Sequence, residues 1–125
     1  MLMGEVTLDK LDKININILK RLTDDKLRLL CKNIRTFLIN NISKTGGHIG
    51  ANLGTIEISV ALHKVFNSPR DKIIFDTGHQ AYTHKILTGR IKKFKFLNKY
   101  KKGFSRFTDR NESKHDIIDV SHEAT

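Results

Sequence analysis

The chain has 125 residues, of which 38% are hydrophobic and 29% charged, with a formal net charge of +10 and a pI near 9.9. This length suits one domain, and a single proline with eight glycines excludes a disordered or low-complexity chain. Cys31 is the only cysteine, which excludes an intrachain disulfide and a thiolate metal cluster.

The first residues give no sign of a targeting or membrane segment. Glu5, Asp9 and Asp12 interrupt every apolar run there, so we expect neither a signal peptide, nor a transit peptide, nor a membrane span. The composition predicts a globular protein of the cytoplasm.

One helix is expected before a glycine-rich turn and another after it. Apolar residues recur every three or four positions over residues 24–41, which predicts an amphipathic helix with Cys31 on its buried stripe. The turn at residues 45–54 breaks this pattern, and a second helix is predicted over residues 55–66.

A buried strand is predicted at residues 72–76, where β-branched and aromatic residues lie between turn signals. Helices are then expected over residues 80–88, closed by Gly89, and over residues 91–99. A second strand is expected at residues 117–120. Two strands are too few for a complete sheet, so the order predicts an α/β chain that is mostly helical.

Lysine and arginine concentrate between Lys85 and Lys102, around Ile91, Phe94 and Leu97. The plainest interpretation is an amphipathic helix with a solvated basic face. A nucleic-acid surface and a surface for a phosphorylated substrate or an acidic partner are alternatives. No helix-turn-helix, zinc-finger or single-strand-binding signature supports the former, so we do not expect nucleic acid to be the partner.

Two histidines stand where ligands are commonly bound. His48 lies among glycines, which allow a ligand to approach the backbone closely, although such a cluster could also be only a flexible turn. His79 follows the predicted strand at the edge where parallel sheets place ligands, although it could also only cap the next helix. An imidazole can donate or accept a proton near neutral pH.

The other internal histidines are expected to be structural or solvated. We assign His63 to packing, His84 and Lys85 to packing or to a solvent-facing position, and His115 to the surface. His79 and His84 are five residues apart, which does not match the spacing of a helical zinc pair, so no metal site is predicted.

Two stretches carry a family resemblance. Residues 43–54 read Ser-Lys-Thr-Gly-Gly-His-Ile-Gly-Ala-Asn-Leu-Gly, and residues 76–90 read Asp-Thr-Gly-His-Gln-Ala-Tyr-Thr-His-Lys-Ile-Leu-Thr-Gly-Arg. With these motifs the chain resembles, from about residue 8 to residue 125, the first domain of the 1-deoxy-D-xylulose-5-phosphate synthase family, which is transketolase-like and uses thiamine diphosphate. The resemblance implies an incomplete portion of a thiamine-diphosphate-binding, parallel-sheet domain, with residues 1–125 as a single partial domain.

The resemblance also implies roles for particular residues. His48 would contact substrate and assist proton transfer, and His79 would bind thiamine diphosphate near the reacting carbon. Ser121, His122 and Glu123 stand where the family has Gly-His-Ser or a similar triplet, whose backbone contacts the cofactor's diphosphate. The serine restricts the backbone there, and the glutamate brings a like charge toward the diphosphate.

The later part of the chain departs from the family in other places. Residues 102–107 read Lys-Gly-Phe-Ser-Arg-Phe where the family has Gly-Gly-Leu-Ser-Gly-Phe, whereas residues 110–116 keep Arg-x-Glu-Ser-x-x-Asp. The family's Gly-Asp-Gly and later Asn, which hold the divalent cation, do not occur, and neither does its pyrimidine-binding domain.

The resemblance implies an N-terminal fragment or subunit of an enzyme that condenses pyruvate with glyceraldehyde 3-phosphate, with thiamine diphosphate and Mg²⁺ in the complete enzyme. Such enzymes serve the biosynthesis of isoprenoid precursors, thiamine and pyridoxal. We expect this chain to be inactive alone and to associate with itself or with a complementing C-terminal chain. The alternative is a non-catalytic remnant or interaction protein that binds no cofactor.

Overall fold

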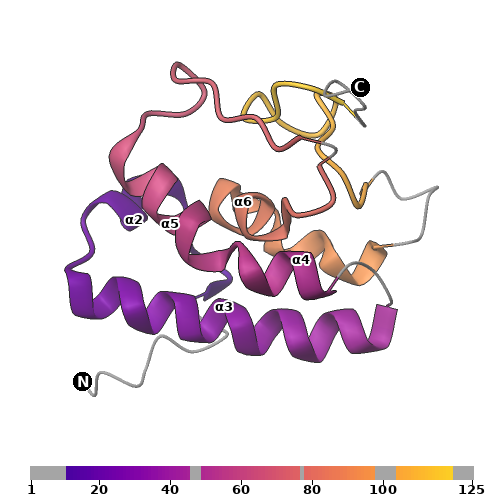
Figure 1. The fold of residues 1–125 in the computed structure, drawn as a ribbon, viewed down its shortest axis with the longest axis horizontal. Coiled ribbons are helices and arrows are strands. Elements are labelled where there is room, and N and C mark those ends of the chain that lie inside the picture. The colour runs from indigo at the N-terminus through magenta and orange to yellow at the C-terminus, as the bar shows by residue number, and fades with distance from the viewer. Residues whose placement is uncertain (1–10, 46–48, 77, 98–103, 120–125) are drawn as a thin grey trace.

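Helices dominate the computed structural model, which describes residues 11–45, 49–76, 78–97 and 104–119 (Figure 1). They are α2 (Ile16–Lys20), α3 (Asp24–Thr45), α4 (Ile49–Gly54), α5 (Ile56–Val65), α6 (Tyr82–Lys85), the π-helix η2 (Ile86–Arg90) and the 3₁₀-helix η3 (Ile91–Phe96). Within these ranges no helix is long and apolar enough to cross a membrane.

The long helix α3 runs beneath the others in Figure 1. Asp24 and Asp25 occupy its first turn, where carboxylates offset the positive end of the helix dipole. Its apolar stripe is buried, with Leu30, Ile34 and Leu38 fully inaccessible to solvent. The predicted helix at residues 24–41 is thus confirmed, and it continues for four residues beyond the expected end, to Thr45.

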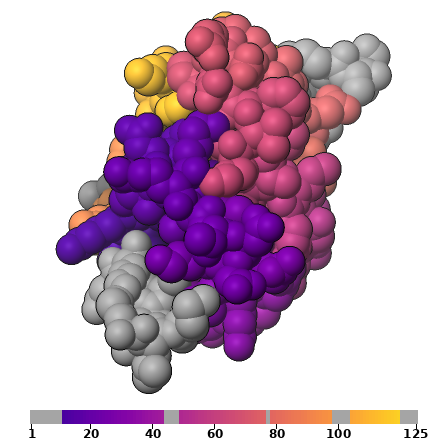
Figure 2. All heavy atoms as spheres, turned by 90° about the vertical axis from the view of Figure 1, so that its left-hand side faces the viewer, coloured from indigo at the N-terminus to yellow at the C-terminus, as the bar shows by residue number. Residues whose placement is uncertain are grey.

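Lysine side chains join α2 to the end of α5. The ammonium of Lys20 donates to the carbonyls of His63 at 3.0 Å and Phe66 at 2.8 Å, while that of Lys64 donates to the carbonyls of Lys20 and Leu22. Figure 2 shows the indigo and violet surface of the N-terminal helices lying directly beside the pink surface of α5 and the residues that follow it. The bonds from Lys20 satisfy carbonyls at the C-terminus of α5, and those from Lys64 satisfy carbonyls at and just after the C-terminus of α2.

One hydrophobic core lies between these helices and the segment α6–η3. Phe94 is at its centre, with ring centroids 5.4 Å from Phe37, 5.6 Å from Tyr82 and 5.1 Å from Phe104. The fully buried aliphatic residues around it come from α2, α3, α5 and η2 and include Leu19, Leu30, Ile34, Leu38, Ile56, Ile86 and Leu87.

The strand predicted at residues 72–76 is not formed in the described part of the chain. The segment is extended and alternates as a strand would, since Ile73 and Phe75 are buried whereas Ile74 is 54% exposed. A strand also needs a hydrogen-bonded neighbour, and the described residues supply none. Residues 117–119 are likewise irregular where the second strand was expected, and Val120 lies outside the described residues. The mostly helical character is confirmed, but the described residues do not show a parallel sheet.

The two helices predicted after residue 80 are shorter and more varied than expected. Gly89 has a φ of +90° and interrupts the helix, as predicted, and the chain continues as the 3₁₀-helix η3 up to Phe96. Ile91 and Phe94 are buried in η3, whereas its lysines are exposed, so a solvated basic face is confirmed there.

Candidate functional site

His79 lies in a turn directly after the extended segment and is half-buried. Gly78 opens this turn with a φ of +89°, a backbone conformation that L side chains rarely adopt. A Cβ on Gly78 would lie 3.3 Å from both the backbone nitrogen and the hydroxyl of Thr108, so the loop of residues 104–119 packs closely over the turn. Glycine is therefore required here both for its φ and for this close approach.

The side chain of Asn52 joins the first motif to this turn. Asn52 lies in α4, is completely buried, and donates from its Nδ2 to the carbonyl of His79 at 2.7 Å. Its Oδ1 accepts from the backbone N–H of Tyr82 at 2.8 Å. The hydroxyl of Thr55 donates to the carbonyl of Gln80 at 3.1 Å. These hydrogen bonds hold the His79 turn and the start of α6 against Asn52, which lies within the first glycine-rich motif, and Thr55, which directly follows it.

The remaining expected site residues lie outside the described part of the chain. These are His48, Ser121, His122 and Glu123. Helix α4 begins at Ile49, the residue after His48, and contains Asn52. The convergence of His48 and His79 on one crevice therefore stays a prediction, as do the roles of all five residues.

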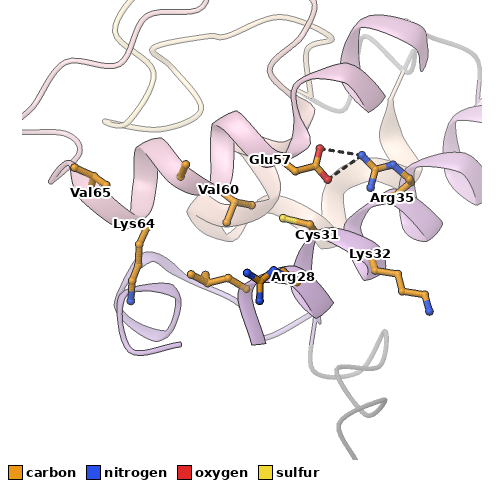
Figure 3. Close-up of a pocket in the computed structure, with 10 residues that line it drawn as sticks. Arg28, Cys31, Lys32, Arg35, Glu57, Val60, Lys64 and Val65 are labelled. Atoms are coloured by element: carbon orange, nitrogen blue, oxygen red, sulfur yellow. Dashed lines mark hydrogen bonds and ion pairs between the residues drawn. The ribbon is translucent and has the colours of Figure 1, made fainter. Parts of the chain in front are cut away.

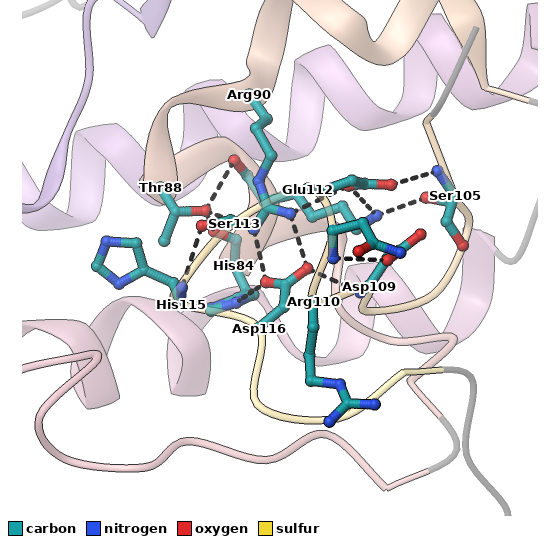
Figure 4. Close-up of polar contacts among 12 residues, drawn as sticks. His84, Thr88, Arg90, Ser105, Asp109, Arg110, Glu112, Ser113, His115 and Asp116 are labelled. Atoms are coloured by element: carbon teal, nitrogen blue, oxygen red, sulfur yellow. Dashed lines mark hydrogen bonds and ion pairs between the residues drawn. The ribbon is translucent and has the colours of Figure 1, made fainter.

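A cluster of buried ionic side chains holds the loop of residues 104–119 against α6 and η2 (Figure 4). This charge cluster consists of His84, Lys85, Arg90, Glu112 and Asp116. Two cations face two carboxylates, so the charges balance with His84 neutral. The cluster joins the second family motif to the retained Arg-x-Glu-Ser-x-x-Asp.

Lys85 is completely buried at one end of the charge cluster. Its ammonium donates to Oε1 of Glu112 at 2.8 Å and to the carbonyl of Ser105 at 2.6 Å, and lies 4.5 Å from the ring centroid of Phe104. Burial lowers the pKa of Lys85, although the hydrogen bond and the charge of Glu112 oppose this shift. The second oxygen of Glu112 accepts from the backbone N–H of Ser105 at 2.6 Å.

Asp116 occupies the other end of the charge cluster. Arg90 donates to both of its oxygens, at 2.7 and 2.8 Å, and His84 Nε2 lies 2.8 Å from Oδ1. The backbone N–H of Asp109 also donates to Asp116, at 2.9 Å. Burial alone would raise the pKa of Asp116, but the hydrogen bonds from Arg90 and His84 outweigh it and hold that pKa below its usual range.

The imidazoles of His63 and His84 are stacked, with centroids 5.0 Å apart and His63 Nε2 2.8 Å from His84 Nδ1. Since His84 Nε2 carries the proton donated to Asp116, Nδ1 accepts from His63. Burial lowers the pKa of His63 to about 3 and also lowers that of His84, because a buried imidazole loses the water that would stabilise its positive charge. Packing is thus the correct alternative for His84 and Lys85, and the solvent-facing one is wrong.

His115 is half-buried, with Nδ1 2.9 Å from the hydroxyl of Ser68, so its predicted exposure is wrong. The chain around it folds back because Asp116, the next residue, is anchored in the charge cluster.

An apolar groove of about 360 Å³ lies between α3 and α5, away from the His79 turn (Figure 3). Cys31 and Val60 form its floor, and an exposed ion pair between Arg35 and Glu57 spans it at 3.0 Å. Cys31 is buried, as predicted, and burial raises the pKa of its thiol to about 11, so it is not poised as a nucleophile. Within the described ranges no three histidine, cysteine, aspartate or glutamate side chains could together hold a metal ion.

Sequence reasoning missed both Asn52 and the charge cluster. A signal for the cluster was present, since Lys85 and Arg90 interrupt an apolar run that is otherwise suited to a core, and buried cations require buried carboxylates. Asn52 gave no comparable signal, because nothing local to α4 shows that its amide faces a turn 27 residues further along the chain.

Comparisons with known proteins agree with the two motifs. A sequence model of the family described as 1-deoxy-D-xylulose-5-phosphate synthase matches residues 8–125. A protein of that name from Macrococcus caseolyticus is 56% identical over 109 residues, which are 87% of this chain and 17% of the relative. Relatives of the same name from Geobacillus sp. and Thermobifida fusca are 53% and 55% identical over 111 residues, 89% of this chain and 18% and 17% of their own lengths. The chain thus spans less than a fifth of these relatives, and it belongs to the 1-deoxy-D-xylulose-5-phosphate synthase family.

Proposed function

We propose that this chain supplies the N-terminal part of an enzyme that condenses pyruvate with glyceraldehyde 3-phosphate and releases carbon dioxide, on the cytoplasmic route to isoprenoid precursors, thiamine and pyridoxal. The family match over residues 8–125 supports this, as does the presence of both glycine-histidine motifs. Residues 1–125 would form a single partial domain.

The observation that carries the proposal is the hydrogen bond from Asn52 to the His79 carbonyl, because it joins the segments that contain the two motifs. In the proposed site His79 contacts thiamine diphosphate close to the reacting carbon, and His48 contacts the substrate and moves a proton. Each imidazole can perform this task near neutral pH.

Thiamine diphosphate, when bound, supplies carbanion stabilisation that no protein side chain offers. Of the described residues, the His79 turn fits such a cofactor, because the turn is held rigidly and its histidine remains half-exposed. The backbone of Ser121, His122 and Glu123 would contact the diphosphate. Mg²⁺, which would offset the charge of Glu123, would be held by residues that this sequence lacks, since it contains no Gly-Asp-Gly.

A complementing chain, or a second copy, would pack against the extended segment of residues 72–76. Ile74 is 54% and Phe66 46% exposed, and both border a surface hollow of about 470 Å³ next to backbone whose burial alternates as in a strand. Apolar surface beside such an edge favours pairing with another chain. A monodisperse monomer in sedimentation, with a single cooperative unfolding transition, would count against this association.

Reconstitution tests the proposal. The purified chain, with thiamine diphosphate and Mg²⁺, should form no product from the two substrates, and product should appear on adding the Macrococcus relative from which the matching segment has been deleted. In the reconstituted pair, His48→Ala or His79→Ala should each lower turnover by about 10² to 10⁴, the range for a positioned acid or base. His115→Ala serves as the control. Near-normal turnover with both histidines replaced would refute the roles proposed for them.

A non-catalytic remnant is the second candidate, favoured by the replacement of the family's Gly-His-Ser by Ser121, His122 and Glu123. Such a protein would associate with the complementing chain yet bind no thiamine diphosphate. Calorimetric titration of the assembled pair with the cofactor separates the two candidates.

A further inference from the structure

Asn52 is the one side chain of α4 that is completely buried and bonded across to the His79 turn through both atoms of its amide. The bond to the His79 carbonyl is 2.7 Å long, and the bond from the Tyr82 N–H is 2.8 Å long. Asn52 donates the first of these hydrogen bonds and accepts the second. Together they fix both the distance between α4 and the turn and the rotation of the turn about its own axis.

The chemistry of the two partners specifies asparagine. A carbonyl oxygen can only accept and a backbone N–H can only donate, so the residue between them needs a donor and an acceptor on one short planar group. Aspartate would place an ionised acceptor against the His79 carbonyl, and leucine would leave both backbone groups unsatisfied. Both replacements would be costly in a fully buried position.

The opposite face of the turn is restrained as well. A Cβ on Gly78 would lie 3.3 Å from the Thr108 backbone nitrogen, and the loop that carries Thr108 is anchored by Glu112 and Asp116. The turn is thus held between α4 and the anchored loop, and its histidine is left half-exposed. The contact with α4 links the turn to the motif that contains His48.

We propose that Asn52 is a positioning residue that fixes the backbone of the His79 turn relative to α4 and thereby restricts where the His79 imidazole can lie. This rests on the proposed function insofar as His79 is taken to face the cofactor. The positioning itself does not depend on the proposed function, because the hydrogen bond from the Asn52 amide to the His79 backbone carbonyl is made within this chain.

The test uses the full chain with carbon-13 label in its histidine rings, and His79→Gln assigns the His79 signal. Asn52→Leu keeps the volume and removes both hydrogen bonds. In this variant the His79 ring signal should move to the position of a freely rotating imidazole, whereas the signal of the buried His63 should stay in place. Hydrogen exchange of the Tyr82 amide should become at least about tenfold faster. Ile34→Val, which trims the core without touching the turn, is the control for general loss of stability and should move neither ring signal.

A parallel titration of the reconstituted pair with thiamine diphosphate and Mg²⁺ separates this proposal from the proposed function. Asn52→Leu should weaken binding at least about tenfold while Ile34→Val does not. If the wild-type pair binds no cofactor but the His79 signal still responds to Asn52→Leu, the cofactor role fails and the positioning role stands. If the His79 signal and the affinity are unchanged in Asn52→Leu, or if both ring signals move together, Asn52 is not a positioning residue.

Discussion

Two regions pack against the segment formed by α6 and η2, and they do so through different chemistry. One region is the pair of helices α2 and α5, and the other is the loop of residues 104–119. Between the helices the contacts are largely aliphatic, and side chains such as Leu19 and Ile56 are completely buried. The loop has little regular structure and is held by four buried charges, together with backbone N–H groups that donate to the two carboxylates.

The difference affects how each region tolerates change. An aliphatic contact can be repacked by a residue of similar volume, whereas a buried ion pair that loses one partner leaves an uncompensated charge. The charge cluster therefore fixes the loop, and Thr108 within it, in one position over Gly78. The His79 turn depends on this more demanding region.

Removing one carboxylate should have the largest effect. Asp116→Ala leaves Arg90 without its bidentate partner and should lower the free energy of unfolding by about 3–5 kcal/mol, measured by urea denaturation. As a control, Asp119→Ala removes an exposed carboxylate that pairs with Arg110, and it should leave the midpoint of urea denaturation unchanged.

A helical substitution of similar cost separates the two regions. Leu38→Ala should lower stability by about 2–5 kcal/mol without changing the amide chemical shifts of residues 104–119. If Asp116→Ala proves too unstable to measure, Asp116→Asn removes only the charge. Equal stability of wild type and both Asp116 variants would show that the cluster does not hold the loop.

Acid should weaken the cluster next. Because the pKa of His63 is lowered to about 3 and that of His84 is also lowered, the unfolded chain binds more protons below about pH 6.5, and stability falls as pH falls. His63 should contribute about 2 kcal/mol of loss between pH 7 and pH 5, and His84 should add a loss of the same sign. The lowered pKa of Asp116 adds to this only in stronger acid.

Thermal unfolding followed over this pH range checks the expectation. His63→Gln, which still donates to His84 but does not titrate, should remove the His63 share of this loss, about 2 kcal/mol between pH 7 and pH 5, and so flatten the pH dependence. A stability that is constant from pH 7 to pH 5 would contradict the neutral state assigned to both histidines.

The junction between η2 and η3 should give the smallest effect. Gly89 has a φ of +90° with no neighbouring atom within 4 Å of an added Cβ, so Gly89→Ala costs only backbone strain, about 1 kcal/mol. Gly50 is helical and equally open, so Gly50→Ala should instead stabilise by roughly 0.4–1 kcal/mol. Equal shifts in melting temperature for the two variants would show that backbone conformation at Gly89 is not limiting.

Sequence periodicity identified the helices, because α3 and α5 each bury a stripe that their own residues specify. A strand at residues 72–76 was predicted from β-branched and aromatic residues between turn signals, but a strand also needs a neighbour to pair with, which this pattern does not specify. His79 was proposed as a site residue from its motif, and its role stays a prediction. Asn52 and the charge cluster depend on contacts between residues far apart in the chain. The cations of the cluster left a signal in the sequence, but neither spacing nor composition identifies their carboxylate partners, and the Asn52 contact left no signal.

Amide hydrogen exchange in the loop tests most directly whether buried carboxylates hold it in place. The N–H groups of Ser105 and Asp109 lie outside any helix, and each donates to a buried carboxylate, Glu112 at 2.6 Å and Asp116 at 2.9 Å. We predict that both exchange about as slowly as the amides at the centre of α3, in the range set by global unfolding. Exchange at the rate of an unprotected peptide would contradict the account, because the loop would then open independently of the helices beneath it.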